Sequence, residues 1–337
     1  MQAPRYDAGM SFFAIVFALL LEQVRPLSSG NLVHAGVRSW VRWCSRNFDA
    51  GRAHHGWVVW GLAVGLPTLA TFAIHVVLIE FAGWPFAALW SAALLYVTLG
   101  FRQFSHRFTD IRDALEAGDE ERARELLARW RQVELREQPR SELVRGVIEH
   151  SVLQAHRHVF GVLAWYSILA AFGFGPAGAV LYRVSELASR YWRHQAAVAH
   201  LPVSDAVQSA ASEAWRLIDW FPARITALGF AVVGSFEEAI DSWRNQVRRF
   251  PDDNDGVILA ATAGAINVRL GDGLSKAVAV TPAVDGADQV VDDGLGLATP
   301  GRDPEPAQLA QVVGLVWRSV VMWLVLLALL TLARLLG

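Results

Sequence analysis

Long apolar runs alternate with arginine-rich polar stretches along this chain. The run 57–79 is predicted to cross a bilayer as a helix, which takes about 20 predominantly apolar residues, and 312–336 is predicted to be a C-terminal span. Pro67 lies inside the first run and is tolerated in a membrane helix. The other apolar segments are 84–101, which is expected to form a helical hairpin with 57–79, the long run 159–182, the short run 10–21 and, as a weaker candidate, 219–235. The pattern predicts an all-α fold, a polytopic integral membrane protein whose single membrane domain covers 10–337.

The polar stretches between these runs predict two further features. Leucines at helical spacing with charges between them occupy 102–145, and Gly118 and Asp119 interrupt the pattern. We therefore expect a cytoplasmic helical hairpin over 102–145. Residues 281–307 combine Ala, Val, Asp, Gly and Pro with weak periodicity, which indicates a loop or linker.

The distribution of arginine predicts the orientation in the bacterial inner membrane. The loop 22–56 and the segment 102–158 are rich in arginine, whereas the link 80–83 has none, so the first two are expected in the cytoplasm. Two alternatives stand for 159–182: a full span, or a re-entrant hairpin that turns back at Gly-Phe-Gly-Pro. The hairpin is favoured because it keeps the arginines after 182, beginning with Arg183, on the cytoplasmic side.

Composition supports a membrane location and excludes several classes of protein. Hydrophobic residues make up 53% and charged residues 18%, below the roughly 25% of an ordinary soluble domain. The net charge of −2 excludes a strongly basic nucleic-acid binder, so the expected partner is the lipid bilayer and no nucleic acid. The 14 Trp suit membrane interfaces, and the single Cys44 excludes an internal disulfide or a multi-cysteine metal site.

General motifs identify no catalytic residue and no metal site. The chain has no GxxxxGK[ST], HExxH or CxxC pattern. His150 and His158 are eight residues apart, whereas a helical metal pair is better placed at four, so we expect a polar helix face there. Glu22 ends the first apolar run, where its carboxylate either binds a cation or faces water.

Three stretches resemble one membrane family in their order and residues. They are GPAGAVLYR at 175–183, DWFPARITAL at 219–228 and NDGVILAATAGAINVRLGDG at 254–273. The chain resembles the CobD/CbiB family, the cobinamide-phosphate synthases of cobalamin biosynthesis, and also AmpE, a membrane protein of that superfamily linked to β-lactamase regulation. The resemblance implies ATP-dependent amide formation that gives adenosylcobinamide phosphate, with Mg-ATP as cofactor if the activity persists.

The chain departs from the family pattern at its acidic positions. Gln154, His158, Trp215, Arg216 and Leu259 stand where the family pattern has acidic residues. Glu149 keeps its acidic position, and Glu22 stands where the pattern has Asp. Loss of most carboxylates favours a binding fold without the metal-dependent step. The resemblance thus leaves two alternatives, a synthase-like amide ligase or a non-catalytic AmpE-like regulator or sensor of envelope or β-lactamase signalling.

The resemblance also implies a set of ligand-binding candidates. They are Arg224, Arg269, Asn254, Gly256, Gly271, Glu22, Glu149 and Arg183. Arg224 and Arg269 are expected to hold the phosphate or carboxylate of a small anionic or corrinoid-like ligand. The alternative is that both arginines snorkel or form ion pairs at the membrane surface.

Overall fold

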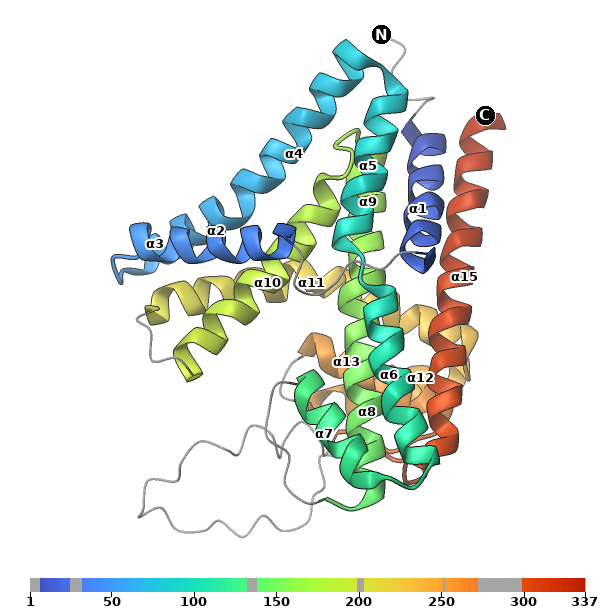
Figure 1. The fold of residues 1–337 in the computed structure, drawn as a ribbon. Coiled ribbons are helices and arrows are strands. Elements are labelled where there is room, and N and C mark those ends of the chain that lie inside the picture. Colours follow the sequence, from blue (N-terminus) through green and yellow to red (C-terminus); the bar gives the residue numbers. More distant parts are fainter. Residues whose placement is uncertain are drawn as a thin grey trace. The chain divides into compact units, whose positions relative to one another are not determined.

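The protein is mostly helical in the part that its computed structural model describes, residues 7–24, 32–131, 138–198, 203–250, 253–271 and 299–336. The first helices are α1 (Asp7–Val24), α2 (Leu32–Phe48), α3 (Ala53–Trp60), α4 (Leu66–Val77), α5 (Trp84–Thr98), α6 (Phe101–Glu116), α7 (Glu120–Arg131) and α8 (Arg140–Ala155). They are followed by α9 (Gly161–Ala171), α10 (Ala177–Val198), α11 (Asp205–Val233), α12 (Phe236–Gln246), α13 (Asp253–Ile266) and α15 (Pro306–Leu336). Among the described residues the only β-type pairing is one isolated bridge, so the all-α prediction is confirmed (Figure 1).

Four short helical turns complete these elements. Gly61–Gly65, Leu78–Ala82 and His156–Phe160 are π-helical turns η1, η2 and η3, and Val247–Arg249 is the 3₁₀ turn η4. The arginine-rich stretch treated above as a loop, 22–56, contains α2. Its core-facing residues recur at helical spacing, with arginines on the other side, which is the pattern of an amphipathic helix.

The chain divides into two compact units, each built from segments that are distant in the sequence. Unit 1 comprises Met1–Gln103, His156–Pro222 and Val321–Gly337. Unit 2 comprises Phe104–Ala155 and Ala223–Val320.

Two of the described helices are long and apolar enough to cross a membrane. One runs without interruption over Ala53–Ala82, and the other over Pro306–Ala333. At a rise of about 1.5 Å per residue, each exceeds the roughly 30 Å of a bilayer core. Pro67 lies two residues after the end of the turn η1, where a widened helix accommodates a residue that lacks an N–H donor. The predicted run 57–79 lies inside the first of these helices, and 312–336 lies inside α15, which extends to Leu336.

The run 159–182 is not one helix but a helical hairpin in unit 1. α9 ends at Ala171 and α10 begins at Ala177, and the two helices pack against each other. Gly173 and Gly175 adopt positive φ values of 82° and 55° in the turn, a region that glycine enters without steric cost. The chain therefore reverses at Gly-Phe-Gly-Pro, as in the second of the two alternatives.

The core of unit 1 forms where α2, α3 and η1 meet α10 and α11. Its buried members include Val41 and Cys44 of α2, Val64 of η1, Trp192 of α10 and Val207 of α11. Trp40 packs against this cluster, and its indole N–H donates to the carbonyl of Ala63 at 3.1 Å. α2 is thereby attached firmly along the side of α10.

Unit 2 is organised around α8 and α13. Nearly every residue of α8 from Leu143 to Ala155 is buried, and α8 packs against α7 and α13. α6 and α7 lie in the range of the predicted hairpin, joined at Gly118, whose φ is +80°. In the predicted linker 281–307, residues 281–298 lie outside the described residues, and α15 already begins at Pro306.

Candidate ligand-binding site

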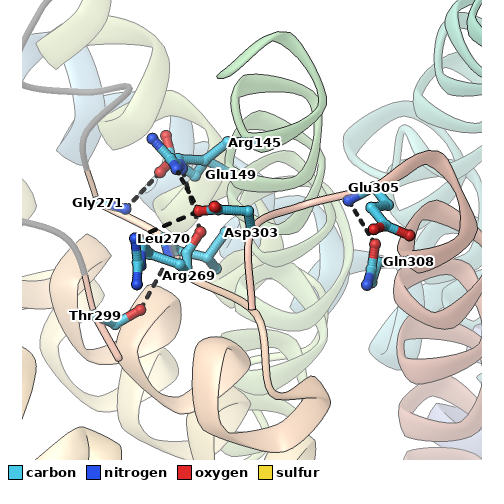
Figure 2. Close-up of polar contacts among 9 residues, drawn as sticks. All are labelled: Arg145, Glu149, Arg269, Leu270, Gly271, Thr299, Asp303, Glu305 and Gln308. Carbon is cyan, nitrogen blue, oxygen red and sulfur yellow. Dashed lines mark hydrogen bonds and ion pairs between the residues drawn. The ribbon is translucent and has the colours of Figure 1, made fainter. Parts of the chain in front are cut away.

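Three of the eight sequence candidates, Glu149, Arg269 and Gly271, lie in one polar group of unit 2, where α8 faces the segment that follows α13. Figure 2 shows Arg145 and Glu149 of α8 directed toward residues 269–271. The two are four residues apart, so they share one face of the helix. Glu149 is buried, and its Oε1 accepts a hydrogen bond from the Gly271 backbone N–H at 2.7 Å.

Two arginines converge on one carboxylate in this group. Arg145 Nη2 lies 3.7 Å from Asp303 Oδ1, and Arg269 Nη1 lies 3.4 Å from the same oxygen. Both distances exceed the roughly 2.7–2.9 Å of a tight charge-assisted hydrogen bond. The Asp303 side chain is 65% exposed, whereas Arg145 is buried and its Nε donates to the Arg269 carbonyl at 3.3 Å. The carboxylate is therefore held loosely at the outer side of the arginine pair.

A short pairing of two extended segments fixes these residues. The Arg269 N–H donates to the Arg302 carbonyl at 2.8 Å, and the Thr299 N–H donates to the Leu270 carbonyl at 2.7 Å. Thr299 Oγ1 in turn accepts the Leu270 N–H at 2.9 Å (Figure 2). Gly301 at φ +141° lies so close to the Val268 backbone that a Cβ would overlap it. Glycine is required at this crossing because no side chain fits between the segments.

The electrostatic setting of Glu149 is cationic. Arg131 of α7 lies within electrostatic range: its burial lowers the pKa of the guanidinium, and the negative charge of Glu149 opposes that change. An arginine keeps its charge under these conditions because its ordinary pKa is far above neutral. The buried carboxylate thus balances positive charge inside unit 2 while it orients a backbone N–H.

Arg224 and Asn254 form a second polar contact in unit 2. Arg224 Nη1 donates to Asn254 Oδ1 at 3.2 Å, and Asn254 is buried in the first turn of α13. Gly256 in the same turn lies beneath Phe250, where a Cβ would be 2.7 Å from the Phe250 Cβ. α13 separates this end from Arg269 by about 20 Å of helix, so the two predicted arginines do not share one ligand group.

The remaining candidates, Glu22 and Arg183, belong to unit 1. Glu22 is 3% exposed on α1, so of its two alternatives the water-facing one is wrong. Arg183 of α10 donates from Nη1 to Glu186 Oε2 at 2.9 Å. Neither residue joins the contacts described for unit 2.

Unit 1 contains a buried polar cluster that sequence reasoning did not include among the candidates. Tyr182 O–H donates to Asp219 Oδ1 at 2.7 Å, and His156 Nε2 lies 2.8 Å from the same oxygen. All three side chains are essentially inaccessible to water. Gly161 lies against the Tyr182 ring, where a Cβ would overlap it. The cluster ties η3, α10 and α11 together with polar contacts in an apolar setting.

Sequence reasoning missed Arg145, Asp303 and Thr299 of the unit 2 group. A signal for Arg145 existed, since it stands four residues before Glu149 and so lies on the same face of a helix. Asp303 and Thr299 carry no local signal, because their place depends on a pairing with residues about thirty positions earlier. Among the described residues no group of three or more His, Cys, Asp or Glu side chains is arranged to hold a metal ion.

Comparison with known proteins finds relatives over most of the chain. Residues 15–280 match the family model described as CobD/Cbib protein. Cobalamin biosynthesis protein CobD from Stutzerimonas stutzeri (strain A1501) is 28% identical over 320 residues, which are 94% of this chain and 96% of that protein. A protein of the same name from Chromobacterium violaceum is 31% identical over 182 residues, 54% of this chain and 55% of that protein. No solved structure matches the chain.

Proposed function

The chain belongs to the CobD/Cbib protein family, and from that premise we propose that it acts in cobalamin biosynthesis by binding an anionic ligand at Arg145 and Arg269. The ligand class is a small phosphate- or carboxylate-bearing molecule, of corrinoid or nucleotide type. The observation that carries this proposal is the exposed Asp303 carboxylate, which touches both arginines at distances too long for tight hydrogen bonds.

The geometry supports exchange of one anion for another. A guanidinium presents a planar fork of donors that matches two oxygens of a phosphate or carboxylate. A ligand anion that fits this fork displaces Asp303 into solvent, where the side chain is already 65% exposed. Glu149 keeps the 269–271 segment in place during the exchange, because its bond to the Gly271 N–H does not involve Asp303.

The reaction we propose is the amide formation of the family's synthases, which gives adenosylcobinamide phosphate. In this reaction the arginine pair would hold and partly neutralise an anionic substrate group. Magnesium ions prefer clustered oxygen ligands, and the described residues offer no such cluster. The role assigned to this chain's residues is therefore confined to binding and orientation.

A second candidate function is that of a non-catalytic membrane regulator of the AmpE type. One observation favours it: Leu259 and Trp215 occupy positions at which the family pattern has acidic residues, and both side chains are buried. A position filled by a buried apolar residue has lost the capacity to bind a cation.

We further propose a multi-pass protein of the bacterial inner membrane. Two long apolar helices support this, together with large hydrophobic side chains that are exposed on the helices of unit 1. Phe13 and Leu20 of α1, Leu69 of α4 and Leu89 of α5 are each more than half exposed. Exposed apolar surface of this extent is typical of contact with lipid.

Complementation tests the proposed function. The chain is expressed in a bacterium that lacks its own cobinamide-phosphate synthase, and growth is scored on cobalamin-dependent medium supplied with cobyric acid. Wild type is expected to restore growth and Arg269→Gln to reduce it. Arg129→Gln is the matched control, because Arg129 is an exposed arginine of the same unit whose partner, Glu125, lies on its own helix.

Asp303→Asn separates ligand binding from structure. If Arg269 acts only through its ion pair with Asp303, Arg269→Gln and Asp303→Asn are expected to reduce growth equally. If Arg269 binds the ligand, Asp303→Asn removes a competing charge and growth is retained. No growth with wild-type protein present in the membrane would contradict the synthase and favour the regulator.

A further inference from the structure

Helix α2 packs one face into the core of unit 1 and leaves the rest of its circumference exposed. Val41 and Cys44 of α2 are fully buried in that core. Arg38, Arg42 and Arg46 are exposed, and their four-residue spacing places them in one line along the helix. This line, the arginine flank, borders the buried face on one side.

A second exposed flank, the tryptophan flank, borders the buried face on the other side. Leu32 and Trp43 are eleven residues apart, which is about three helical turns, so they share this flank. Leu32 is 91% exposed and Trp43 is 48% exposed. Trp40 extends the flank, since its ring stacks on that of Trp43 with 5.2 Å between the centroids. An exposed cationic flank beside an exposed apolar and aromatic one is typical of a helix that lies at a membrane surface.

The arginine flank has no carboxylate partner in the part of the chain that the structure describes. Leu32–Phe48 contains neither Asp nor Glu, and none of the three arginines forms an ion pair with a described acid. Arg42 Nε donates at 2.8 Å to the Tyr191 hydroxyl, which is not a carboxylate. The next acid along the chain, Asp49, already accepts the Ser204 N–H at 2.9 Å and the Ser204 hydroxyl at 2.7 Å.

Helix α7 shows a different arrangement of exposed arginines. Glu125 lies 3.4 Å from Arg122 and 2.9 Å from Arg129, at spacings of three and four residues. Exposed arginines of α7 are thus matched by an acid on the same helix. α2 offers its arginines no such match, so its arginine flank is complementary to an anionic surface.

α2 is attached to the beginning of a helix of membrane length. Residues 49–52 join it to the helix Ala53–Ala82, and α2 packs against α3 and η1 in the first half of that helix. Within unit 1, Figure 1 shows α2 running across the direction of α5 and α9. With 17 residues and three arginines, α2 is itself unsuited to cross a bilayer. A helix in this place lies along the surface of the membrane that Ala53–Ala82 crosses.

We propose that α2 is an interfacial helix whose arginine flank binds the headgroups of anionic phospholipids. The phosphate oxygens of the lipids accept from the guanidinium groups, while Leu32 and Trp43 enter the boundary of the acyl chains. The anionic surface of the cytoplasmic leaflet attracts basic segments of this kind. This inference rests on the membrane location proposed above and is independent of the arginine pair of unit 2. Because α2 packs against α10, bound lipid is expected to stabilise unit 1.

Nanodiscs of defined composition test the lipid preference of the full-length chain. The thermal unfolding midpoint is expected to rise as phosphatidylglycerol replaces phosphatidylcholine. Arg46→Gln is expected to need about fivefold more phosphatidylglycerol for the same rise, whereas Arg46→Lys keeps the charge and the response. Arg129→Gln is the matched control, because Arg129 is an exposed helical arginine that is paired with Glu125. This control is expected to respond as the wild type does.

sn-Glycerol 3-phosphate distinguishes a lipid from a soluble anion. It carries a phosphoglycerol group without acyl chains, so it is expected to leave the midpoint in phosphatidylcholine nanodiscs unchanged. A rise equal to that given by phosphatidylglycerol would overturn the lipid as the occupant. Equal responses of Arg46→Gln and wild type to phosphatidylglycerol would overturn the arginine flank as the binding surface.

Spin labels separate a failure of this inference from a failure of the membrane location. Gly36→Cys carries the label on the tryptophan flank, where nothing lies within 4 Å of an added Cβ. Leu69→Cys within Ala53–Ala82 and Glu121→Cys on α7 are the lipid and water references. The label of Gly36→Cys is expected to be more accessible to oxygen, and less accessible to a nickel chelate, than that of Glu121→Cys.

Two outcomes of the labelling contradict the inference in different ways. If the label of Leu69→Cys lies in lipid but that of Gly36→Cys behaves like that of Glu121→Cys, α2 is not interfacial and the membrane location stands. If the label of Leu69→Cys also behaves like that of Glu121→Cys, the membrane location itself is wrong, and the role of α2 falls with it.

Discussion

Single glycines decide how closely the helices of this protein approach one another. A Cβ on Gly264 of α13 would overlap the carbonyl of Glu238 on α12. A Cβ on Gly178 of α10 would overlap the carbonyl of Trp165 on α9. Backbone atoms cannot rotate away as a flexible side chain can, so these contacts exist only because no side chain is present. Small residues have this role at helix crossings in membrane proteins generally.

Replacement of Gly264 by alanine is expected to destabilise unit 2. The added methyl group has to push α12 away from α13, and overpacking of this kind costs about 1–3 kcal/mol. The measurement is thermal unfolding in detergent, followed by tryptophan fluorescence. Gly36→Ala in α2 is the control, because nothing lies within 4 Å of its added Cβ and alanine favours a helix. Equal shifts of the unfolding midpoint in Gly264→Ala and Gly36→Ala would contradict the close approach of α13 to α12.

Tyr182→Phe is expected to destabilise unit 1, because it removes the hydroxyl that donates a hydrogen bond to Asp219. Asp219 is fully buried, so removal of the Tyr182 hydroxyl leaves its Oδ1 with one partner fewer, at a cost of about 1–3 kcal/mol. Tyr191→Phe is a matched control, since its hydroxyl meets Arg42 in an exposed position. The unfolding midpoints of the two variants are compared. If the unfolding midpoint falls less in Tyr182→Phe than in Tyr191→Phe, the buried Tyr182–Asp219 hydrogen bond does not stabilise unit 1 as proposed.

At the scale of elements, α10 and η3 make the stability of unit 1 dependent on pH. His158 has a lowered pKa in the folded chain, because burial and Arg183 disfavour its charged form. In the unfolded chain it titrates near its ordinary pKa of about 6.5. Glu186 behaves in the opposite way: burial raises its pKa, but Arg190 and Arg183 outweigh burial and lower it well below the usual range. Its stabilisation is present above about pH 4 and is lost only in stronger acid.

The unfolding midpoint is therefore expected to fall as the pH is lowered from 7 to 5. In this window the unfolded state binds a proton at His158 that the folded state does not bind, so protonation favours unfolding. The loss is at most about 1.4 kcal/mol per pH unit for each such histidine. His158→Gln is expected to flatten the profile, and His54→Gln, on the exposed start of α3, to leave it unchanged. A profile of unchanged slope in His158→Gln would contradict this assignment.

The elements differ in how far the sequence predicts them. The apolar run 57–79 identifies its helix directly, because length and hydropathy are local properties. α2 was overlooked because its arginines dominate the composition, although Val37, Val41 and Cys44 recur at helical spacing. The pairing of Thr299 with Leu270 is not predictable from local pattern, since it joins two short segments that are 29 positions apart in the sequence.

At the scale of the whole molecule, the arginine distribution predicts which segments face the cytoplasm. Glu80, in the turn η2, belongs to the link without arginine, whereas Glu121 lies in the arginine-rich α7. Burial raises the pKa of the Cys44 thiol to about 11, so the native cysteine is unreactive at neutral pH. Cysteine labelling of a variant with one added cysteine therefore needs no prior removal of Cys44.

Glu80→Cys is expected to react with a membrane-impermeant maleimide in intact cells. Glu121→Cys is expected to react only after lysis, because its arginine-rich segment is predicted to lie in the cytoplasm. The measurement is the extent of labelling of each variant before and after lysis. Labelling of Glu121→Cys in intact cells, with Glu80→Cys protected, would reverse the topology.

The interleaving of the two units has a consequence for synthesis on the ribosome. Unit 1 takes its last segment from Val321–Gly337, whereas unit 2 needs nothing beyond Val320. All of unit 2 is therefore translated after the first 103 residues and before Val321–Gly337, the last segment of unit 1. Nascent segments with exposed apolar surface are prone to misassociation during such a delay. Early helices that pack against one another, such as α2 against α10, can make those contacts before Val321–Gly337 is synthesised. The surface that this last segment completes is therefore the part of unit 1 that stays open for most of translation.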